Sequence, residues 1–502
     1  MSNFGLRRPH AAIAGNSRSS QDEYRRKWFV DSVNGNDANN GKSSLFAFAT
    51  ISALSAADIH ANDIVCLARG SLWREQLSIS VTGVDVSAYG SGAKPILDGS
   101  NVLSAGSWTK TGGQTYVYQA TVSPEFWEGS GKDFINVWEN NTYLVLATSV
   151  ANCDATVGSY YPSALTGTIT LYIHSTGHTD PRSDGKTYEF TQRRLGIEAR
   201  GAERVVLENI ETRKSMSKDG STTLGKYGQA RSCAFNWGNL HNILIETGCQ
   251  MMNCTVAECY AGTESTAMIV YNSNTPAGEG ILIKDCTVQC TTYNALAIGI
   301  YGHSNVSGSF GAVLVDGCTL SNLYGGISGI HGEIVCDGCD TSECHIPYII
   351  YEDAYTINNA YHVDAASLTQ RFVSMGAGTS LNMNDGVVQM TYATDYTGAI
   401  FTGGSGCSIN LQRCSIAITQ NDIAGGSCIY SEHDAAVTIK DSTLDCNNWG
   451  WAFYLTDASV TVEADRNHYV DSDTRFHYRG TTYANLAAWQ AASGQDENST
   501  AG

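Results

Sequence analysis

The chain has 502 residues, of which 42% are hydrophobic and 16% charged, and its formal net charge at pH 7 is −19. This hydrophobic content supplies a large core and excludes an extensively disordered chain. No continuous apolar run reaches about 18 residues, so we expect no membrane insertion. The acidic balance argues against a nucleic-acid partner, because phosphate binding needs clustered lysine and arginine.

Residues 1–27 are polar and aperiodic, and two interpretations of this N-terminal tail stay open. It is either a tail without fixed structure or an attachment segment that docks on a partner. The segment lacks the apolar stretch of a signal peptide. We therefore expect the chain to fold in a reducing cytoplasm, with most of its 16 cysteines as free thiols.

Short strands and turns begin at Trp28 and predict an N-terminal cap with the first coils over residues 28–102. Within WFVDSVNGNDANNGKSS, a short β-prone run is followed by a cluster of Asn, Gly and Asp, which favours tight turns. Residues 103–195 are richer in Trp and Tyr and do not share the later repeat. For that region we predict a small β-rich insertion.

From about residue 204 the sequence repeats alternating apolar residues, a short polar turn and commonly Cys-Thr or Ser-Thr. Copies include NILIETGCQMMNCTV, GILIKDCTVQC, AVLVDGCTLSN and AVTIKDSTLDC. Because one unit cannot bury its apolar side chains alone, stacked units predict a solenoid over residues 196–465, closed by a C-terminal cap over 466–502. We expect the same position of each coil to hold a small buried side chain. The cysteines at this position are Cys254, Cys286, Cys318, Cys339 and Cys414.

Three segments of the sequence resemble the right-handed parallel β-helix proteins of the pectin-lyase-like group. They are FVDSVNGNDANNGKSS with ATISAL, DIVCLARGSLWREQLSI with AYGSGAKPILDGS, and YANLAAWQAASGQDENST. With the repeats, the resemblance covers most of residues 28–502 and implies an all-β, right-handed parallel β-helix with an N-terminal cap, a β insertion and a C-terminal cap. It does not fix the activity, since this fold hosts lyases, hydrolases, epimerases and non-catalytic adhesins.

An aromatic residue recurs in the segment that we align as the second strand of each coil. The aligned positions are Tyr271, Tyr301, His331, Tyr351, Phe401, Tyr430 and Tyr454. Since strand side chains alternate, the preceding Val or Ile should point inward and the aromatic residue outward. Such a ladder suits a sugar chain, whose C–H faces pack on aromatic rings. The alternative, which we weigh equally, is surface packing that stabilises the sheet.

Titratable residues lie close to this ladder and predict two kinds of chemistry. Hydrolysis of a glycan needs two carboxylates, and Glu333 with Asp353, about one coil apart at roughly 5 Å, fit a retaining pair. β-Elimination instead needs a base, for which Tyr301, His303 and His331 are candidates. We expect substrate binding by a further set, namely Tyr271, Tyr351, Tyr430, Glu352, Glu432 and His241. The competing interpretation is that strand-end carboxylates are solvated and that a lone histidine bonds a turn.

The leading prediction is that the protein binds and cleaves an acidic extracellular polysaccharide in a groove along the β-helix. The resemblance implies a phage-tail depolymerase of the tailspike type, a homotrimer that attaches to the virion through residues 1–27. It would act outside the cell after release by lysis or as part of the virion. Two alternatives stay open: a non-catalytic structural or receptor-binding β-helix, and a secreted bacterial polysaccharide lyase or epimerase. We expect no cofactor and no metal site, although a requirement for a divalent cation stays open.

Overall fold

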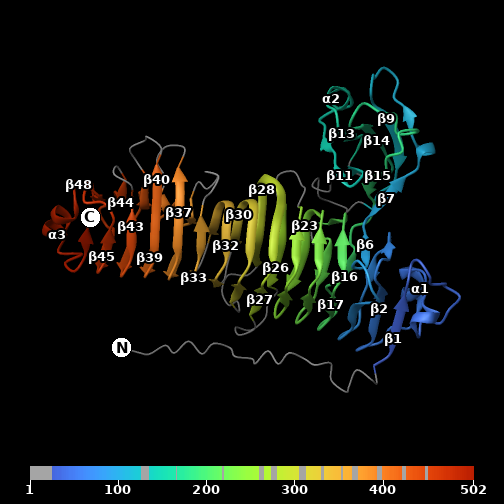
Figure 1. Ribbon diagram of the computed structural model, residues 1–502, viewed down its shortest axis with the longest axis horizontal. Helices are drawn as coiled ribbons and strands as arrows, with labels where there is room; N and C mark the ends of the chain where they lie inside the picture. The colour runs from blue at the N-terminus through green and yellow to red at the C-terminus, as the bar shows by residue number, and fades with distance from the viewer. Residues whose placement is uncertain are drawn as a thin grey trace.

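The protein, seen in a computed structural model, is an elongated solenoid with one compact insertion beside its N-terminal end (Figure 1). Residues 1–24 of the predicted N-terminal tail lie outside the described residues. The structure describes residues 25–125, 135–164, 167–217, 220–258, 265–272, 280–304, 312–329, 333–351, 354–363, 371–392, 398–420, 426–446 and 450–502.

Each coil of the solenoid contributes one strand to a long parallel sheet, which we call the first face. Neighbouring strands of this sheet come from successive coils, so every crossover returns through the other faces. The strands are β1 (Lys27–Val30), β2 (Ile64–Ala68), β5 (Asp85–Tyr89), β17 (Val206–Glu208), β21 (Gln229–Arg231), β24 (Gln250–Met252), β27 (Ile281–Lys284), β29 (Val313–Asp316), β31 (Ile334–Asp337), β33 (Ala354–Asn358), β36 (Ser380–Asn384), β39 (Cys407–Gln412), β42 (Ala435–Lys440) and β45 (Thr461–Asp465).

After the first face, each coil passes through a second face. Its strands also pair in parallel from coil to coil. They are β3 (Leu72–Trp73), β6 (Ile96–Asp98), β18 (Glu211–Arg213), β22 (Ala234–Asn236), β25 (Thr255–Ala257), β34 (Tyr361–Val363), β37 (Val387–Tyr392), β40 (Ser415–Gln420), β43 (Thr443–Asp445), β46 (His468–Tyr469) and β49 (Thr500–Ala501).

A third face completes the coil, and three long strands, β28 (Thr287–Ser304), β30 (Thr319–Gly329) and β32 (Asp340–Ile350), run through both the second and third faces. The all-β parallel β-helix predicted from the sequence is confirmed. The other strands of the third face are β4 (Leu77–Ser78), β16 (Ile197–Ala199), β20 (Thr222–Leu224), β23 (Asn239–Glu246), β26 (Ser265–Asn272), β35 (Val373–Met375), β38 (Gly398–Thr402), β41 (Ser427–Ser431), β44 (Trp451–Leu455) and β47 (Arg475–Tyr478), with β19 (Met216–Ser217) paired to β23 and β48 (Thr481–Tyr483) antiparallel to β47.

The turn between the first and second faces explains the recurring cysteine. One residue at this turn has positive φ in successive coils, for example Asp285 at 51°, Gly317 at 60° and Gly338 at 60°. The next residue points into the core, where a small side chain fits between coils. The predicted equivalence of the five cysteines is confirmed, since each follows such a turn and is buried. The thiol of Cys318 donates to the carbonyl of Ile283 in the preceding coil at 3.6 Å.

Side chains from all three faces meet in one continuous hydrophobic core. The fifteen described cysteines are buried, most of them in this core, and none of them is in a disulfide. Among the described residues, no helix is both long enough and apolar enough to cross a membrane.

Both ends of this core are covered by short helices. At the N-terminal end, α1 (Ile51–Ala56) buries Ile51 and Leu54 and follows the short helix η2 (Ser44–Phe46). At the C-terminal end, α3 (Leu486–Ser493) places Trp489 against Phe453 and Phe476, with ring centroids 5.1 and 5.8 Å apart. These helices shield the terminal coils, which have no further coil to pack against.

The insertion interrupts the first coils between β6 and β16 and, unlike the solenoid, is built mainly from antiparallel strands, although β12 and β13 pair in parallel. One sheet joins β7, β15, β10 and β11, a second joins β8, β9, β14, β13 and β12, and α2 packs on the second. The elements are β7 (Ser100–Leu103), η3 (Ala105–Ser107), β8 (Thr109–Lys110), β9 (Tyr118–Val122), β10 (Val137–Glu139), β11 (Thr142–Tyr143), β12 (Val145–Leu146), α2 (Val150–Ala155), β13 (Ser159–Pro162), β14 (Ile169–His174) and β15 (Tyr188–Thr191). It has its own hydrophobic core.

Candidate functional site

The register of the third face divides the predicted aromatic ladder into two rows. Cα pairing runs from Tyr301 through Ser328, Ile349 and Ser374 to Phe401, Tyr430, Tyr454 and His477. Two residues further along each strand a second row contains Glu246, Tyr271 and His303, which pair with one another. Tyr271 and Tyr351 therefore lie outside the row that contains Tyr301, contrary to the sequence alignment.

The cause of this difference is the inward residue that sets the register. The core row on the third face contains Ile300, Ile327, Tyr348, Ile400 and Ile429, all buried. Tyr348 is an aromatic residue that points inward, so aligning the coils on tyrosine alone shifts the strand of Tyr351 by two residues. The strand of Tyr271, whose inward residue is Met268, is shifted by the same amount. Both outward positions still have the alternation that the sequence predicts.

Four rings at the C-terminal end of the first row form a continuous stack, which we call the aromatic row: Phe401, Tyr430, Tyr454 and His477. Successive ring centroids are 5.7, 5.5 and 4.3 Å apart, and the interplanar angles are 11°, 6° and 14°. The guanidinium of Arg371 lies 3.6 Å from the Phe401 centroid. These spacings follow the separation of parallel strands, about 4.8 Å, with a small adjustment for ring thickness.

This stacking changes which part of each ring faces a ligand. Because neighbouring rings and Arg371 cover the faces, the surface presents ring edges and the phenol hydroxyls. Ring edges carry partial positive charge and hydroxyls bond in both directions. The aromatic row therefore suits a hydroxyl-rich ligand held by hydrogen bonds rather than one packed on an open ring face.

Glu432 belongs to the second row and meets the aromatic row directly. The hydroxyl of Tyr430 donates to the Glu432 carboxylate, which is exposed at the end of β41. Partial burial, together with this carboxylate, raises the pKa of Tyr430 well above its usual value. The phenol is therefore a hydrogen-bond donor at neutral pH and not a base.

Two arginines lie along the aromatic row, Arg371 beside Phe401 and Arg475 beside Trp451. Arg475 lies 4.8 Å from the ring of Trp451, whose indole meets Tyr454 edge to face at 5.4 Å. At the end of the row, partial burial lowers the pKa of His477, so the imidazole is neutral at pH 7. The row thus combines neutral donors and acceptors with one exposed carboxylate.

The second row also brings together residues from the N-terminal coils. Arg200 donates to Glu246 at 2.9 Å, and Glu246 pairs in register with Tyr271 and then His303. The side chains of Tyr271 and His303 lie outside what the structure describes, so only their backbone positions are known. Tyr351 directly follows β32 and has an exposed side chain, and partial burial raises its pKa.

The remaining predicted residues are placed as follows. Tyr301 is half-buried in the first row, and Glu333 is exposed immediately before β31, with its carbonyl accepting from Val313 at 3.0 Å. His241 is half-buried in β23, and its carbonyl accepts from Ser221. The other three predicted residues, His331, Glu352 and Asp353, lie outside the described residues, so the expected carboxylate pair is not tested by geometry.

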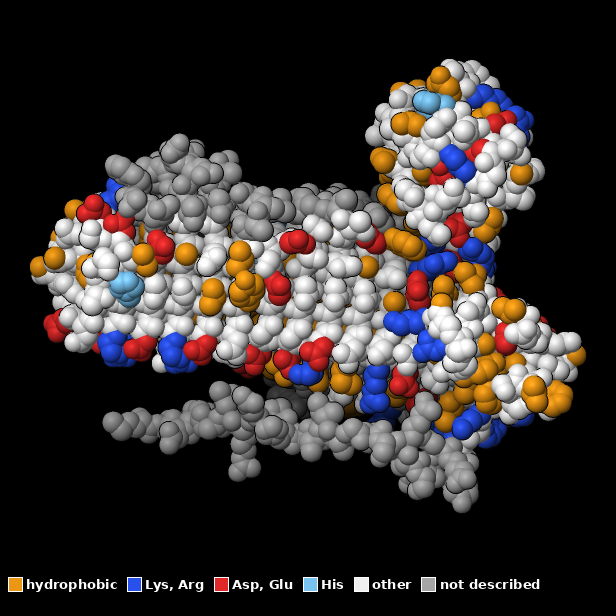
Figure 2. Space-filling view, in the orientation of Figure 1, with side chains coloured by type: hydrophobic (Ala, Val, Ile, Leu, Met, Phe, Trp, Pro, Cys, Tyr) orange, Lys and Arg blue, Asp and Glu red, His pale blue; other side chains and the backbone are white. Residues whose placement is uncertain are grey.

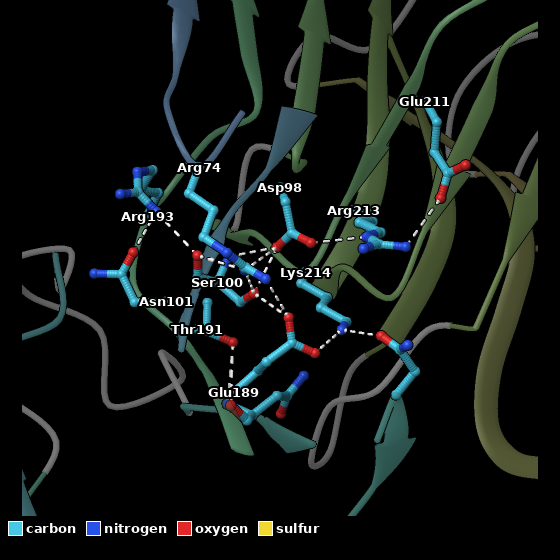
Figure 3. A network of polar contacts seen from close by, with 12 residues as sticks. Arg74, Asp98, Ser100, Asn101, Glu189, Thr191, Arg193, Glu211, Arg213 and Lys214 are labelled. Carbon is cyan, nitrogen blue, oxygen red and sulfur yellow. Dashed lines mark hydrogen bonds and ion pairs between the residues drawn. The ribbon is translucent and has the colours of Figure 1, made fainter. Parts of the chain in front are cut away.

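A buried ionic network joins the insertion to the solenoid (Figure 3). Arg74 contacts Glu189 at 2.7 Å and Asp98 at 3.3 Å, and Arg213 donates to Asp98 at 2.8 Å. Asp98 and Glu189 are nearly inaccessible to solvent. Removing such charges from water is costly unless they are paired, so the network fixes the position of the insertion rather than offering a reactive group.

Lys214 is the centre of this junction. It has no exposed surface, and its ammonium pairs with Glu189 and donates to Asn141 at 2.6 Å. The ammonium also lies 5.1 Å from the ring of Trp138 in the insertion and 5.3 Å from that of Trp237 in the solenoid. Burial lowers the pKa of Lys214 despite these partners.

Charge is distributed unevenly along the chain. Residues 285–502 contain 6 Lys and Arg against 23 Asp and Glu, a net charge of −17 out of −19 for the whole protein. Lys and Arg gather instead around the junction with the insertion (Figure 2). The aromatic row therefore lies in the acidic half, where a polyanion would be repelled. Among the described residues, no cluster of three His, Cys, Asp or Glu side chains is placed to hold a metal ion.

Sequence reasoning missed the contributions of Arg371, Trp451 and His477 to this site. The signal for His477 was available, since RFHY at 475–478 aligns with AFYL at 452–455 once the inward phenylalanines are matched. Arg371 is different, because it lies before β35 at a position that the repeat does not mark, and only the structure places it 3.6 Å from the Phe401 centroid.

No family model matches the sequence, and no curated protein matches it. Among solved structures the chain is similar to XylC in complex with xylose, with a TM-score of 0.55 and 10% identity over 95% of this chain and 86% of that one. A glycoside hydrolase gives a TM-score of 0.44 and 10% identity over 88% of this chain and 96% of that one. The tailspike gp61 of Pseudomonas phage phi297 gives 0.26 and 10% over 84% and 68%. At this identity the first similarity is one of fold.

Proposed function

We propose that this protein binds and cleaves an extracellular polysaccharide along the two outward rows of the third face. The observation that supports this most is the hydrogen bond from Tyr430 to Glu432 in the middle of the stacked rings. It places an exposed carboxylate beside a continuous surface of ring edges and hydroxyls. Sugars are bound by such combinations of aromatic contact and directed hydrogen bonds.

Because the aromatic row lies in the acidic half of the chain, we favour a neutral glycan over an acidic polysaccharide as its ligand. The sequence alone favoured an acidic polysaccharide, but a net charge of −17 over residues 285–502 opposes a polyanion at this surface. Hydrolysis suits a neutral glycan, since β-elimination needs a uronic acid. In hydrolysis Glu432 is our first candidate for one of the two carboxylates, and Glu333 with Asp353 is the alternative pair.

The biological setting that we propose is the tail of a phage, where the protein acts as a homotrimer outside the host cell and residues 1–27 attach it to the virion. The support for this setting is the resemblance of the opening and closing segments to β-helix proteins of that kind. It is independent of the chemistry at the aromatic row.

The test is incubation of the full chain with a panel of neutral and acidic bacterial and algal polysaccharides. Reducing ends report cleavage, and absorbance near 235 nm reports elimination. We expect reducing ends alone, on a neutral glycan. Glu432→Gln should lower kcat by about a hundredfold or more if this carboxylate is catalytic, whereas the matched control Glu463→Gln, on the first face, should not change it.

The other outcomes separate the remaining assignments. Loss of activity in Glu333→Gln but not in Glu432→Gln would move the reaction to the central coils. A rise at 235 nm on a uronic acid polymer would contradict both the neutral substrate and hydrolysis. Binding without cleavage would favour a receptor-binding protein, which fits the protonated phenol of Tyr430 because that group cannot act as a base.

A further inference from the structure

The insertion carries an exposed aromatic ring whose position is fixed from several directions. Tyr116 lies in the loop between β8 and β9, and 40% of its surface is exposed. The backbone amides of Thr115 and Tyr116 donate to the Asp154 carboxylate at 3.0 and 2.6 Å. Lys110 donates to the carbonyl of Thr115 at 2.5 Å.

Two imidazole rings contact the ring of Tyr116. The ring centroid of Tyr116 is 5.0 Å from that of His174, with the rings 10° from parallel, and 4.3 Å from that of His178. The two imidazole centroids are 4.9 Å apart. Two rings on opposite faces of a phenol would be separated by roughly twice the stacking distance. The nearly equilateral triangle therefore excludes imidazoles on opposite faces of the phenol, and one face of Tyr116 is uncovered by them.

The hydrogen bonds of the two histidines fix their tautomers. His174 is buried, and its Nδ1 lies 3.0 Å from the carbonyl of Cys153, which only accepts, so Nδ1 carries the proton. In a neutral pair, Nε2 of His174 then accepts from Nδ1 of His178 at 2.8 Å. Nε2 of the exposed His178 is left as an acceptor, and no partner among the described residues bonds to it. His178 also holds a positive φ of 58°, a conformation that is uncommon outside glycine and often functional.

We propose that the insertion has a sugar-binding site in which a neutral pyranose packs its C–H face on Tyr116 and donates a hydroxyl hydrogen bond to Nε2 of His178. An open ring face beside a fixed acceptor is the arrangement that such a ligand needs. The site differs from the aromatic row, where the ring faces are covered, and it does not depend on the function proposed for the solenoid. Asp154, His174 and His178 lie beside the ring, which disfavours a protein partner, since a stable protein interface needs a larger apolar centre.

Saturation-transfer difference NMR with the full chain tests this site. The probes are the methyl glycosides of glucose, galactose, mannose and N-acetylglucosamine. We expect transfer from at least one of them, confined to protons of one pyranose face. Tyr116→Phe should retain it, since the ring face is kept, and Tyr116→Ala should weaken binding about tenfold or more.

Two further variants make the result decisive. His178→Asn keeps a residue that tolerates positive φ and removes the ring acceptor, and it should weaken binding by roughly threefold to tenfold. Tyr361→Ala removes a tyrosine that is 52% exposed on the solenoid and should leave binding unchanged. The proposal is overturned if no glycoside shows transfer, if Tyr116→Ala binds like the parent chain, or if binding is lost in Glu432→Gln instead.

Discussion

The buried ammonium of Lys214 makes a strong prediction about the rigidity of the junction. The variant Lys214→Met removes the charge and keeps an unbranched chain of similar length between the two indoles. It removes the ion pair with Glu189, the hydrogen bond to Asn141 and the contacts with Trp138 and Trp237. Glu189 keeps Arg74 as a partner at 2.7 Å, so its carboxylate is not left alone.

The magnitude follows from these contacts. Breaking a buried ion pair by removing one partner costs about 3–5 kcal/mol. The remaining Arg74 reduces this penalty, and sulfur–aromatic contacts of the new methionine recover about 0.3–1.5 kcal/mol for each ring. Loss of the cation–π contacts acts in the opposite direction, by about 0.5–2 kcal/mol each. We expect a net loss of about 2–4 kcal/mol in the free energy of local opening at the junction.

Hydrogen–deuterium exchange of β7 and β15 measures this loss, because these strands begin and end the insertion. A loss of about 2–4 kcal/mol corresponds to exchange that is roughly 30-fold to 900-fold faster. The matched control is Lys284→Met, which breaks an ion pair with Asp316 whose side chains are 35% and 33% exposed, and which should cost under about 1 kcal/mol. Equal effects of the two substitutions would refute the view that the junction is held by buried charge.

Two further predictions concern the core and its C-terminal end. The fifteen buried thiols should not react with Ellman's reagent in the native protein, whereas all 16 cysteines should react after unfolding in guanidinium; a shortfall after unfolding would indicate disulfides. Asp496→Ala should lower the free energy of unfolding of the last coils by about 3–5 kcal/mol. It removes the carboxylate that accepts from the indole N–H of Trp489 and the hydroxyl of Tyr469, both at 2.9 Å, and leaves these buried donors without an acceptor. Thermal unfolding measures this, and the exposed Asp473→Ala should shift Tm little; an equal shift would contradict the role of Asp496.

The fold could be predicted because each coil repeats the same local pattern. Alternating apolar residues, a turn residue with positive φ and a small buried residue occur within about ten positions, and the next coil repeats them. The position of the cysteine in GILIKDCTVQC follows from its own turn at Asp285, before its contact with the carbonyl of Met251 in the preceding coil is considered. Local information was therefore enough for the architecture and for the cysteine position.

The candidate site could be predicted only in part, because it depends on register. Phe401, Tyr430 and Tyr454 were grouped correctly since each follows an inward apolar residue in a short strand of the same length. Tyr351 was misplaced because the inward position of its strand is held by Tyr348, a residue that the alignment took for neither role. The junction was not predictable, as Arg213 and Asp98 are 115 positions apart and no feature of the repeat marks them as partners.

A repeating scaffold also restricts where function can reside. Identical coils would give every outward position the same neighbours. A uniform row of rings is therefore, in the first place, a consequence of the spacing between coils. Selectivity must come from positions where the repeat is broken: Glu432 supplies a carboxylate beside Tyr430, and the insertion adds Tyr116 with an open ring face. The ionic junction then has a mechanical role, because two binding surfaces held at a set separation raise the effective concentration of the second surface for a glycan bound to the first. Loosening Lys214 should therefore weaken binding to a long glycan more than binding to a monosaccharide.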